Sequence, residues 1–356
     1  MTRKLAVLLT VVLVVALFGG GCGGGGSDQP GKTVEGEEKQ EYLVRFAHEE
    51  IPGSVQDLYA QKFKEVLEKK SDGKIKVEIY PIGQLGDATQ QCELLQTGGL
   101  EFAIISPGNT GTIVPENQLF SLHFLLSDDM NINKRIMKES RALNDMLSKL
   151  YLEKNIKVLA YWTEGFQQWT GNKPLRSPED FKGFKMRTMP SPMIVAAYEA
   201  YGANPTPMPY LEVYSGLQLN MIDGQENPIF AVEEMKFYEV QKALVLANAC
   251  LYVTTTSVNP DFFNSLPDDL QQAVLDTAEE LRDYSFDIQQ KLNDERLGRI
   301  KEVSDIEIIE LSNEEREALR QASMSARDRY VSMVGSKGKE ILDLLVKEVE
   351  QIEKGK

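Results

Sequence analysis

The stretch from Phe184 to Met193 contains the side chains best suited to bind an acid. As a strand it puts Lys185 and Arg187 on one face, and Arg187 then projects near the carboxyl end of a parallel strand, where ligands bind in open α/β sheets. Ser191 followed by Pro192 predicts a helix start, whose free N–H groups add positive potential beside the guanidinium. Together these groups suit a carboxylate. The alternative is an arginine in an ordinary surface ion pair.

A second polar stretch runs from Met221 to Pro228. Asp223-Gly224 predicts a turn, and Asn227 is held extended by the proline that follows it, so its amide can point into a cleft. The alternative is a turn asparagine that bonds its own backbone.

Aromatic side chains gather in residues 161–169, which include both tryptophans, Trp162 and Trp169. A predicted strand gives way to a loop here, and Phe166 and Trp169 on a loop could stack on a ligand or close a lid. Packing in the core is the alternative. Glu49, at the end of the first predicted strand, is a further candidate ligand contact, although neighbouring strand side chains point to opposite faces and do not suit a catalytic pair.

Histidine and cysteine are scarce. His48 and His123 are the only histidines in the 356 residues, which excludes an HExxH zinc site and a two-histidine mechanism. We therefore predict no metal site, no cofactor and no catalytic residues. Cys92 lies in a predicted helix and Cys250 beside a predicted strand, so two buried free thiols are favoured over a disulfide.

The chain is acidic, with 54 Asp and Glu against 39 Lys and Arg and a net charge of −15. Basic residues are interleaved with acidic ones throughout, so no basic surface for phosphate contacts is predicted. This excludes a nucleic-acid partner.

The first 21 residues are predicted to be a signal peptide. Arg3 and Lys4 precede an apolar run from Leu5 to Phe18, which is too short to span a bilayer as a helix. The small residues before Cys22 resemble a bacterial lipoprotein signal, in which that thiol is lipidated, although Gly19 departs from the pattern; ordinary secretion is the alternative. Residues 22–41 have no apolar periodicity and are predicted to form a flexible tether.

From Tyr42 the hydrophobic pattern alternates between strand and helix periods, which predicts a β-α-β-α-β unit, a largely parallel sheet and an α/β fold. The apolar face of the first helix is expected to contain Val55, Leu58, Tyr59, Phe63, Val66 and Leu67. A second α/β series follows, with strands near 157–162, 184–189 and 252–258. Residues 267–303 have helical spacing over about 50 Å, longer than one small domain is wide.

Several segments resemble the solute-binding protein of tripartite ATP-independent periplasmic (TRAP) transporters, of the DctP type. They are SDGKIKVEIYPIGQLGD, LRSPEDFKGFKMR, GANPTPMPYLEVYSGLQLNMIDGQENP and KFYEVQKAL. The resemblance implies a two-lobed periplasmic-binding-protein-like fold with a hinge cleft and a long helix spanning both lobes. We expect lobe I to contain 42–164 and about 254–292, and lobe II to contain 165–253 and about 293–356.

The resemblance also implies site residues. Arg187 matches the family arginine that pairs with the ligand carboxylate, Asn227 matches an asparagine that bonds the same ligand, and Tyr210 occupies an aromatic position. Gln167, a candidate contact, stands where sialic-acid binders have another arginine, so sialic acid is not the expected ligand. Because only one strong cation is identified, a monocarboxylate with an apolar or ring portion is favoured over a dicarboxylate.

The expected function is therefore the extracytoplasmic solute-binding subunit of a TRAP transporter. It would capture an organic acid by cleft closure and deliver it to the membrane permease subunits, and would contact the membrane through a lipid on Cys22. Two alternatives remain open at this point: a secreted enzyme that uses Glu226 or Asp223 as acid or base, and a chemoreceptor-linked binding protein.

Overall fold

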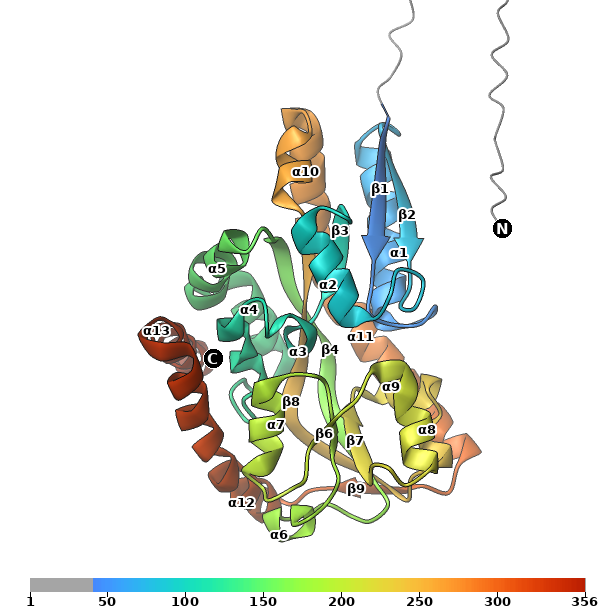
Figure 1. Ribbon diagram of the computed structural model, residues 1–356, viewed down its shortest axis with the longest axis vertical. Helices are drawn as coiled ribbons and strands as arrows, with labels where there is room; N and C mark the ends of the chain where they lie inside the picture. Colours follow the sequence, from blue (N-terminus) through green and yellow to red (C-terminus); the bar gives the residue numbers. More distant parts are fainter. Residues whose placement is uncertain (1–40, 356) are drawn as a thin grey trace, which may run out of the picture. The chain divides into compact units, whose positions relative to one another are not determined.

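The computed structural model describes residues 41–355 (Figure 1). The predicted signal peptide, the lipidation at Cys22 and the tether up to residue 40 lie outside the described residues. In the described part, no helix combines the length and the apolar character needed to cross a bilayer.

The N-terminal elements alternate as predicted: β1 (Tyr42–Ala47), α1 (Val55–Lys70), β2 (Ile75–Tyr80), α2 (Ala88–Thr97) and β3 (Phe102–Ile105). Strand β1 pairs in parallel with both β2 and β3. Helix α2 begins after Asp87, which forms a capping box with Gln90. Val55, Tyr59, Phe63, Val66 and Leu67 are buried on the apolar face of α1 as predicted, whereas Leu58 is exposed.

The sheet is mixed, so the prediction of a largely parallel sheet is wrong. Its order is β2-β1-β3-β8-β4-β7, and β9 (Glu307–Glu310) pairs with one end of β8. The long strands β4 (Lys157–Gly171) and β8 (Ala243–Val258) are antiparallel to each other, and β8 is antiparallel to β3. Strand β7 (Gly224–Asn227) is antiparallel to β4.

Side chains of β8 alternate between two cores. Ala243, Val245 and Ala247 pack in one cluster, whereas Leu244 lies in the cluster on the opposite face. This period of two is that of a strand covered on both sides. A third and larger core surrounds β1 to β3 and α1. Strands β4 and β8 therefore connect two packed regions, and the fold is the expected two-lobed α/β fold.

The remaining short elements are α3 (Pro107–Thr110), η1 (Pro115–Ser121), α4 (Met130–Glu139), η2 (Ala142–Leu147), α5 (Ser148–Glu153), α6 (Pro178–Phe181), β5 (Arg187–Thr188), α7 (Pro192–Glu199), β6 (Thr206–Pro207), η3 (Tyr210–Glu212), α8 (Val213–Gln218), α9 (Ile229–Glu234), η4 (Phe237–Glu239), α10 (Pro260–Ser265) and α12 (Asn313–Ser323). The expected strand at 184–189 is thus reduced to two residues, which pair in parallel with β6.

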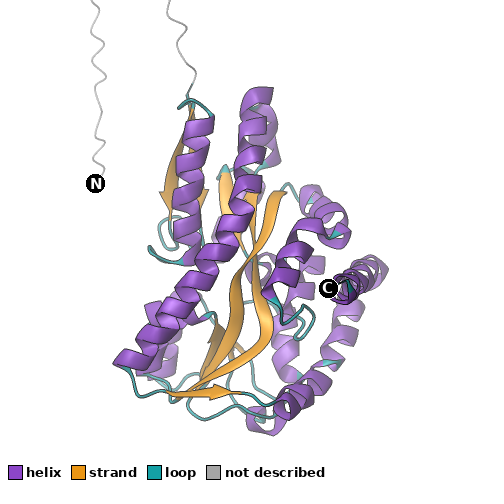
Figure 2. Cartoon of the chain, turned by 180° about the vertical axis from the view of Figure 1, so that it is seen from behind, coloured by secondary structure: helices purple, strands orange, loops and turns teal. Residues whose placement is uncertain are grey.

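Helix α11 (Asp268–Val303) confirms the long helix predicted for 267–303. It contacts α1, β4 and α9, so it runs along both packed regions, on the side of the sheet that faces the viewer in Figure 2. Helix α13 (Ser325–Lys354) changes direction at Gly335 and packs against α4, η1 and η2. The predicted lobe boundaries stay a prediction.

Both cysteines in the described part of the chain are buried and free, as predicted. Cys92 is on α2, and Cys250 is on β8 rather than beside it. Burial raises the pKa of both thiols well above the ordinary value.

Candidate functional site

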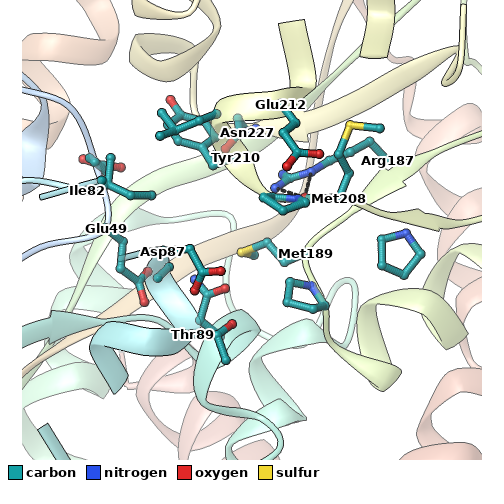
Figure 3. Close-up of a pocket in the computed structure, with 18 of the residues that line it drawn as sticks. Glu49, Ile82, Asp87, Thr89, Arg187, Met189, Met208, Tyr210, Glu212 and Asn227 are labelled. Atoms are coloured by element: carbon teal, nitrogen blue, oxygen red, sulfur yellow. Dashed lines mark hydrogen bonds between the residues drawn. The ribbon is translucent and has the colours of Figure 1, made fainter. Parts of the chain in front are cut away.

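A cavity of about 510 Å³ lies where segments from the two packed regions face each other (Figure 3). One wall comes from residues 49–50, 82–89 and 109, which follow β1, β2 and β3. The other comes from 187–190, 207–212 and 227, and Tyr252 of β8 completes the lining. The first of these walls is formed by loops at the carboxyl ends of β1, β2 and β3, as expected for a ligand site in an α/β sheet.

Arg187 is the cationic side chain of this cavity. It is only 2% exposed, and its Nε and Nη2 donate to the carbonyl oxygen of Met208 at 3.0 and 2.8 Å. In the described part of the chain, it forms no ion pair with a carboxylate. Burial lowers the pKa of the guanidinium, but an arginine stays protonated in proteins. The remaining N–H groups of Arg187 are therefore available to an acid in the cavity.

The start of α7 differs from the expectation of free N–H groups. Ser191 caps the helix by accepting from the Ile194 amide. The side-chain oxygen of Gln118 accepts from the Ser191 hydroxyl at 2.8 Å and from the Met193 amide at 3.1 Å. Because Gln118 and Ser191 already satisfy these donors, the helix N-terminus does not provide the anion site that the sequence predicts.

Asn227 and Tyr210 line the same cavity as Arg187. Asn227 ends β7, and its amide donates to the side-chain oxygen of Gln225 rather than bonding its own backbone. The hydroxyl of Tyr210, in η3, is buried and has no hydrogen-bond partner among residues 41–355. Burial raises the pKa of this phenol well above its ordinary value, so it stays a neutral donor.

Glu49 lies on the side of the cavity opposite Arg187 (Figure 3). It is 3% exposed, and its Oε1 accepts from the Ser106 amide at 3.0 Å. Its Oε2 has no partner among the described residues. Burial raises the pKa of this carboxyl to about 7. Glu49 can therefore accept a hydrogen bond from a cationic group, which would hold it ionised.

Phe166, Gln167 and Trp169 do not line this cavity, and the loop predicted for them is wrong. Strand β4 continues past Trp162 to Gly171 and stays paired with β8, which fixes all three side chains on a strand. Trp169 is 1% exposed, in a core cluster against Phe181. Phe166 and Gln167 line two smaller pockets, of which the one at Gln167 also contacts Met189.

The sequence analysis missed several lining residues, among them Met189, Met208, Ile82, Glu50 and Tyr252. A signal was available for the methionines, because Met189 follows Arg187 closely, Met208 precedes Tyr210 closely, and each stands directly before a proline. A residue before proline is held extended, which favours loops that lie across a cleft.

The acids named for an enzymatic alternative lie elsewhere. Glu226 is 3% exposed and accepts from the Tyr198 hydroxyl at 2.5 Å, and Asp223 accepts from the Lys185 amide. Neither lines the cavity.

Comparison with known proteins places the chain in a family. Residues 46–332 match the family model described as bacterial extracellular solute-binding protein, family 7. The ectoine-binding periplasmic protein TeaA of Halomonas elongata is 39% identical over 300 residues, covering 84% of this chain and 87% of TeaA.

Two solved structures are similar to the chain, one with a bound ligand and one without. A TRAP periplasmic solute-binding protein from Desulfovibrio salexigens with bound orotic acid is 27% identical, with a TM-score of 0.84 and coverage of 88% of this chain and 100% of that chain. The apo open structure of one from Marinobacter aquaeolei VT8 is 40% identical, with a TM-score of 0.78 and coverage of 86% and 100%. These proteins bind solutes rather than catalyse reactions. The chain belongs to this family, and it is a solute-binding subunit of a TRAP transporter.

Proposed function

We propose that the protein captures a small monocarboxylate that also carries a positive charge, such as ectoine, and passes it to TRAP permease subunits. Ectoine is a ring with one carboxylate and one cationic amidinium group. The observation that carries the proposal is the buried guanidinium of Arg187, which faces a cavity without a carboxylate partner in the described chain. Arg187 would hold the ligand carboxylate in a charge-assisted pair, assisted by Asn227 and Tyr210.

The charges of the cavity support a ligand with a cationic group. Four carboxyl groups line it, from Glu49, Glu50, Asp87 and Glu212, against the single guanidinium of Arg187. A second carboxylate on the ligand would face these acids without a cation, and like charges in a poorly hydrated site repel strongly. A monocarboxylate is therefore favoured over a dicarboxylate.

The walls support a ring or apolar portion. Ile82, Met189, Met208 and Tyr252 give apolar surface between the Glu49 and Arg187 ends of the cavity. A mostly apolar wall with a few polar groups is the usual form of a small-molecule site. The ligand contacts predicted at Phe166, Gln167 and Trp169 are not part of the proposal, because these residues do not line the cavity.

Capture by closure is supported by the conformation. The chain superposes better on the orotate-bound protein than on the apo open one, although the open one is more similar in sequence. Walls from both lobes enclose the cavity, so a ligand that contacts both favours the closed form.

A thermal-shift screen tests the ligand class. We expect ectoine to raise the melting temperature in proportion to the logarithm of its concentration above the dissociation constant, and succinate to leave it unchanged. Ectoine recovered unaltered by mass spectrometry would separate binding from turnover. A larger shift with succinate than with ectoine would contradict the proposed charge pattern.

We further propose that Cys22 carries a lipid that holds the protein at the outer face of the cytoplasmic membrane. The support is the apolar run and the small residues that precede this cysteine. We expect Cys22→Ser to move the protein from the membrane fraction to the soluble fraction without changing its ligand affinity. Cell fractionation and intact-mass measurement check this, and a wild-type protein without lipid mass would contradict it.

A further inference from the structure

Three carboxyl groups gather near the point where β4 passes between the lobes. We call Glu50, Glu164 and Glu234 the hinge carboxyl cluster. Glu164 on β4 is fully buried, Glu50 is 6% exposed at the cavity wall, and both carboxyl oxygens of Glu234 on α9 are buried without a partner. In residues 41–355, none of the three forms an ion pair with Lys or Arg, and no group of three or more His, Cys, Asp or Glu is arranged to hold a metal ion.

One glutamine joins two members of the cluster. The Gln56 backbone amide donates to Glu50 Oε2 at 3.2 Å, and its side-chain Nε2 donates to Glu164 Oε1 at 2.7 Å. The second oxygen of Glu164 has no hydrogen-bond partner in the described chain. A buried, unpaired carboxylate is strongly destabilising, and it is neutralised most simply by a proton. Burial, followed by the neighbouring charge of Glu50, raises the pKa of Glu164 well above its ordinary value.

Few cations lie near Glu50 and Glu164 to offset negative charge there. The titratable and charged groups around the cluster come from every element packed on it: His48, Glu49, Asp57, Arg187, Tyr210, Glu233, Tyr252, Arg296 and Arg299. Arg296 and Arg299 are both paired with Glu233, and Arg187 is on the far side of the cavity from Glu49. The charges that act on the Glu164 carboxyl group are therefore those of Glu50 and Glu49 rather than that of a cation.

Glu164 lies on a feature typical of a hinge. The next residue, Gly165, has a φ of +108°, and the pairing with β8 shifts register between Thr163 and Phe166. The Glu164 carbonyl accepts from the Asn293 side chain on α11 at 2.8 Å. Asn293 in turn accepts from the Phe230 amide on α9 at 3.1 Å, so the backbone at Glu164 is tied to the long helix and to the second lobe.

We propose that Glu164, buried beside Glu50, holds a proton in the closed form and releases it when the cleft opens. The inference rests on the proposed closure. Opening would admit water to the cavity wall at Glu50, next to Glu164, and a glutamate that is hydrated ionises near pH 4.3. The closed form is then the one that binds the extra proton, so raising the pH favours the open form. Ligand affinity falls as pH rises, by up to about tenfold per pH unit while one full proton is taken up.

Solution X-ray scattering of the ligand-free protein tests this independently of any ligand. We expect the wild type to expand between pH 5.5 and 8.5, and Glu164→Gln to keep the compact profile at both values. A glutamine keeps the acceptor for Gln56 and donates to Glu50 as a protonated carboxyl would. Glu226→Gln, a buried carboxyl outside the cluster, is the matched control and should expand like the wild type. A wild type with the same profile at both pH values would overturn the proposal.

Chemical unfolding across the same pH range distinguishes a folding defect from a lost proton. If Glu164 is protonated in the folded chain, wild-type stability falls relative to Glu164→Gln as pH rises from 5 to 8, because the folded state holds a proton that the unfolded chain releases. Equal pH dependence of the two proteins would also overturn the proposal. If ectoine fails to bind at any pH while scattering changes as expected, only the proposed ligand is wrong.

Discussion

Arg187→Ala is expected to lose at least about 100-fold in affinity for ectoine, as measured by titration calorimetry. The guanidinium is 2% exposed and already oriented by two hydrogen bonds to the Met208 carbonyl, so it needs little reorganisation to meet a carboxylate. The alanine variant leaves the ligand carboxylate facing four carboxyl groups and no cation in the cavity. Removal of one partner from an enclosed charge pair also leaves the other charge unpaired, which is the larger part of the loss.

Arg187→Lys separates charge from geometry. Lysine keeps the positive charge but cannot hold the Met208 carbonyl and a carboxylate with one planar fork, so we expect an intermediate affinity. The matched control is Arg176→Ala, which removes a half-exposed arginine paired with Glu315 outside the cavity and should bind as the wild type does. Unchanged affinity in Arg187→Ala would refute the assignment of the carboxylate site.

Glu49→Gln is expected to weaken ectoine by about tenfold to 100-fold, because it removes the charge that would meet the amidinium group. The change is nearly isosteric, and the glutamine oxygen can still accept from the Ser106 amide, so the local backbone should be kept. Calorimetry with ectoine and with cyclohexanecarboxylate, a ring acid without the cation, measures the effect. The affinity for ectoine, relative to the affinity for cyclohexanecarboxylate, should fall in the variant.

The comparison of two ligands makes the Glu49 experiment specific. A variant that loses affinity for both acids equally would indicate a disturbed cavity rather than a lost cation site. Glu226→Gln serves as control, since this carboxyl is equally buried but bonded to Tyr198 and away from the lining. An unchanged ectoine affinity in Glu49→Gln would contradict the proposed contact between Glu49 and a cationic group of the ligand. The ligand would then be proposed as an anion without a positive charge.

Local signals predicted much of the fold because they depend on neighbouring residues. The alternation of strands and helices from Tyr42 and the long helix predicted over 267–303 follow from periodicity within one segment. The direction in which two strands pair does not follow from signals within one segment. Strands β4 and β8 are far apart in sequence, and their polar residues, such as Thr163 and Glu164, interrupt the apolar pattern while being buried. A sequence pattern cannot show that Thr163 donates to the Tyr252 carbonyl on the neighbouring strand.

The same distinction holds for the site. Arg187, Tyr210 and Asn227 share one cavity as the family resemblance implied, although their ligand role stays a prediction. The loop predicted at Trp169 is wrong because an aromatic residue after a strand has the same sequence signal whether the strand ends or continues. The role of Gln118 at the start of α7 could not be foreseen, since that contact joins residues far apart in the chain.

The buried sulfhydryl groups of Cys92 and Cys250 determine how this part of the chain responds to oxidants and reducing agents. Nucleophilic attack and oxidation need the ionised sulfur, and a completely enclosed sulfhydryl group with a raised pKa stays in its unreactive acid form. Neither position depends on a covalent cross-link to hold its element in place. Reducing agents should therefore leave the melting temperature of this part of the chain unchanged.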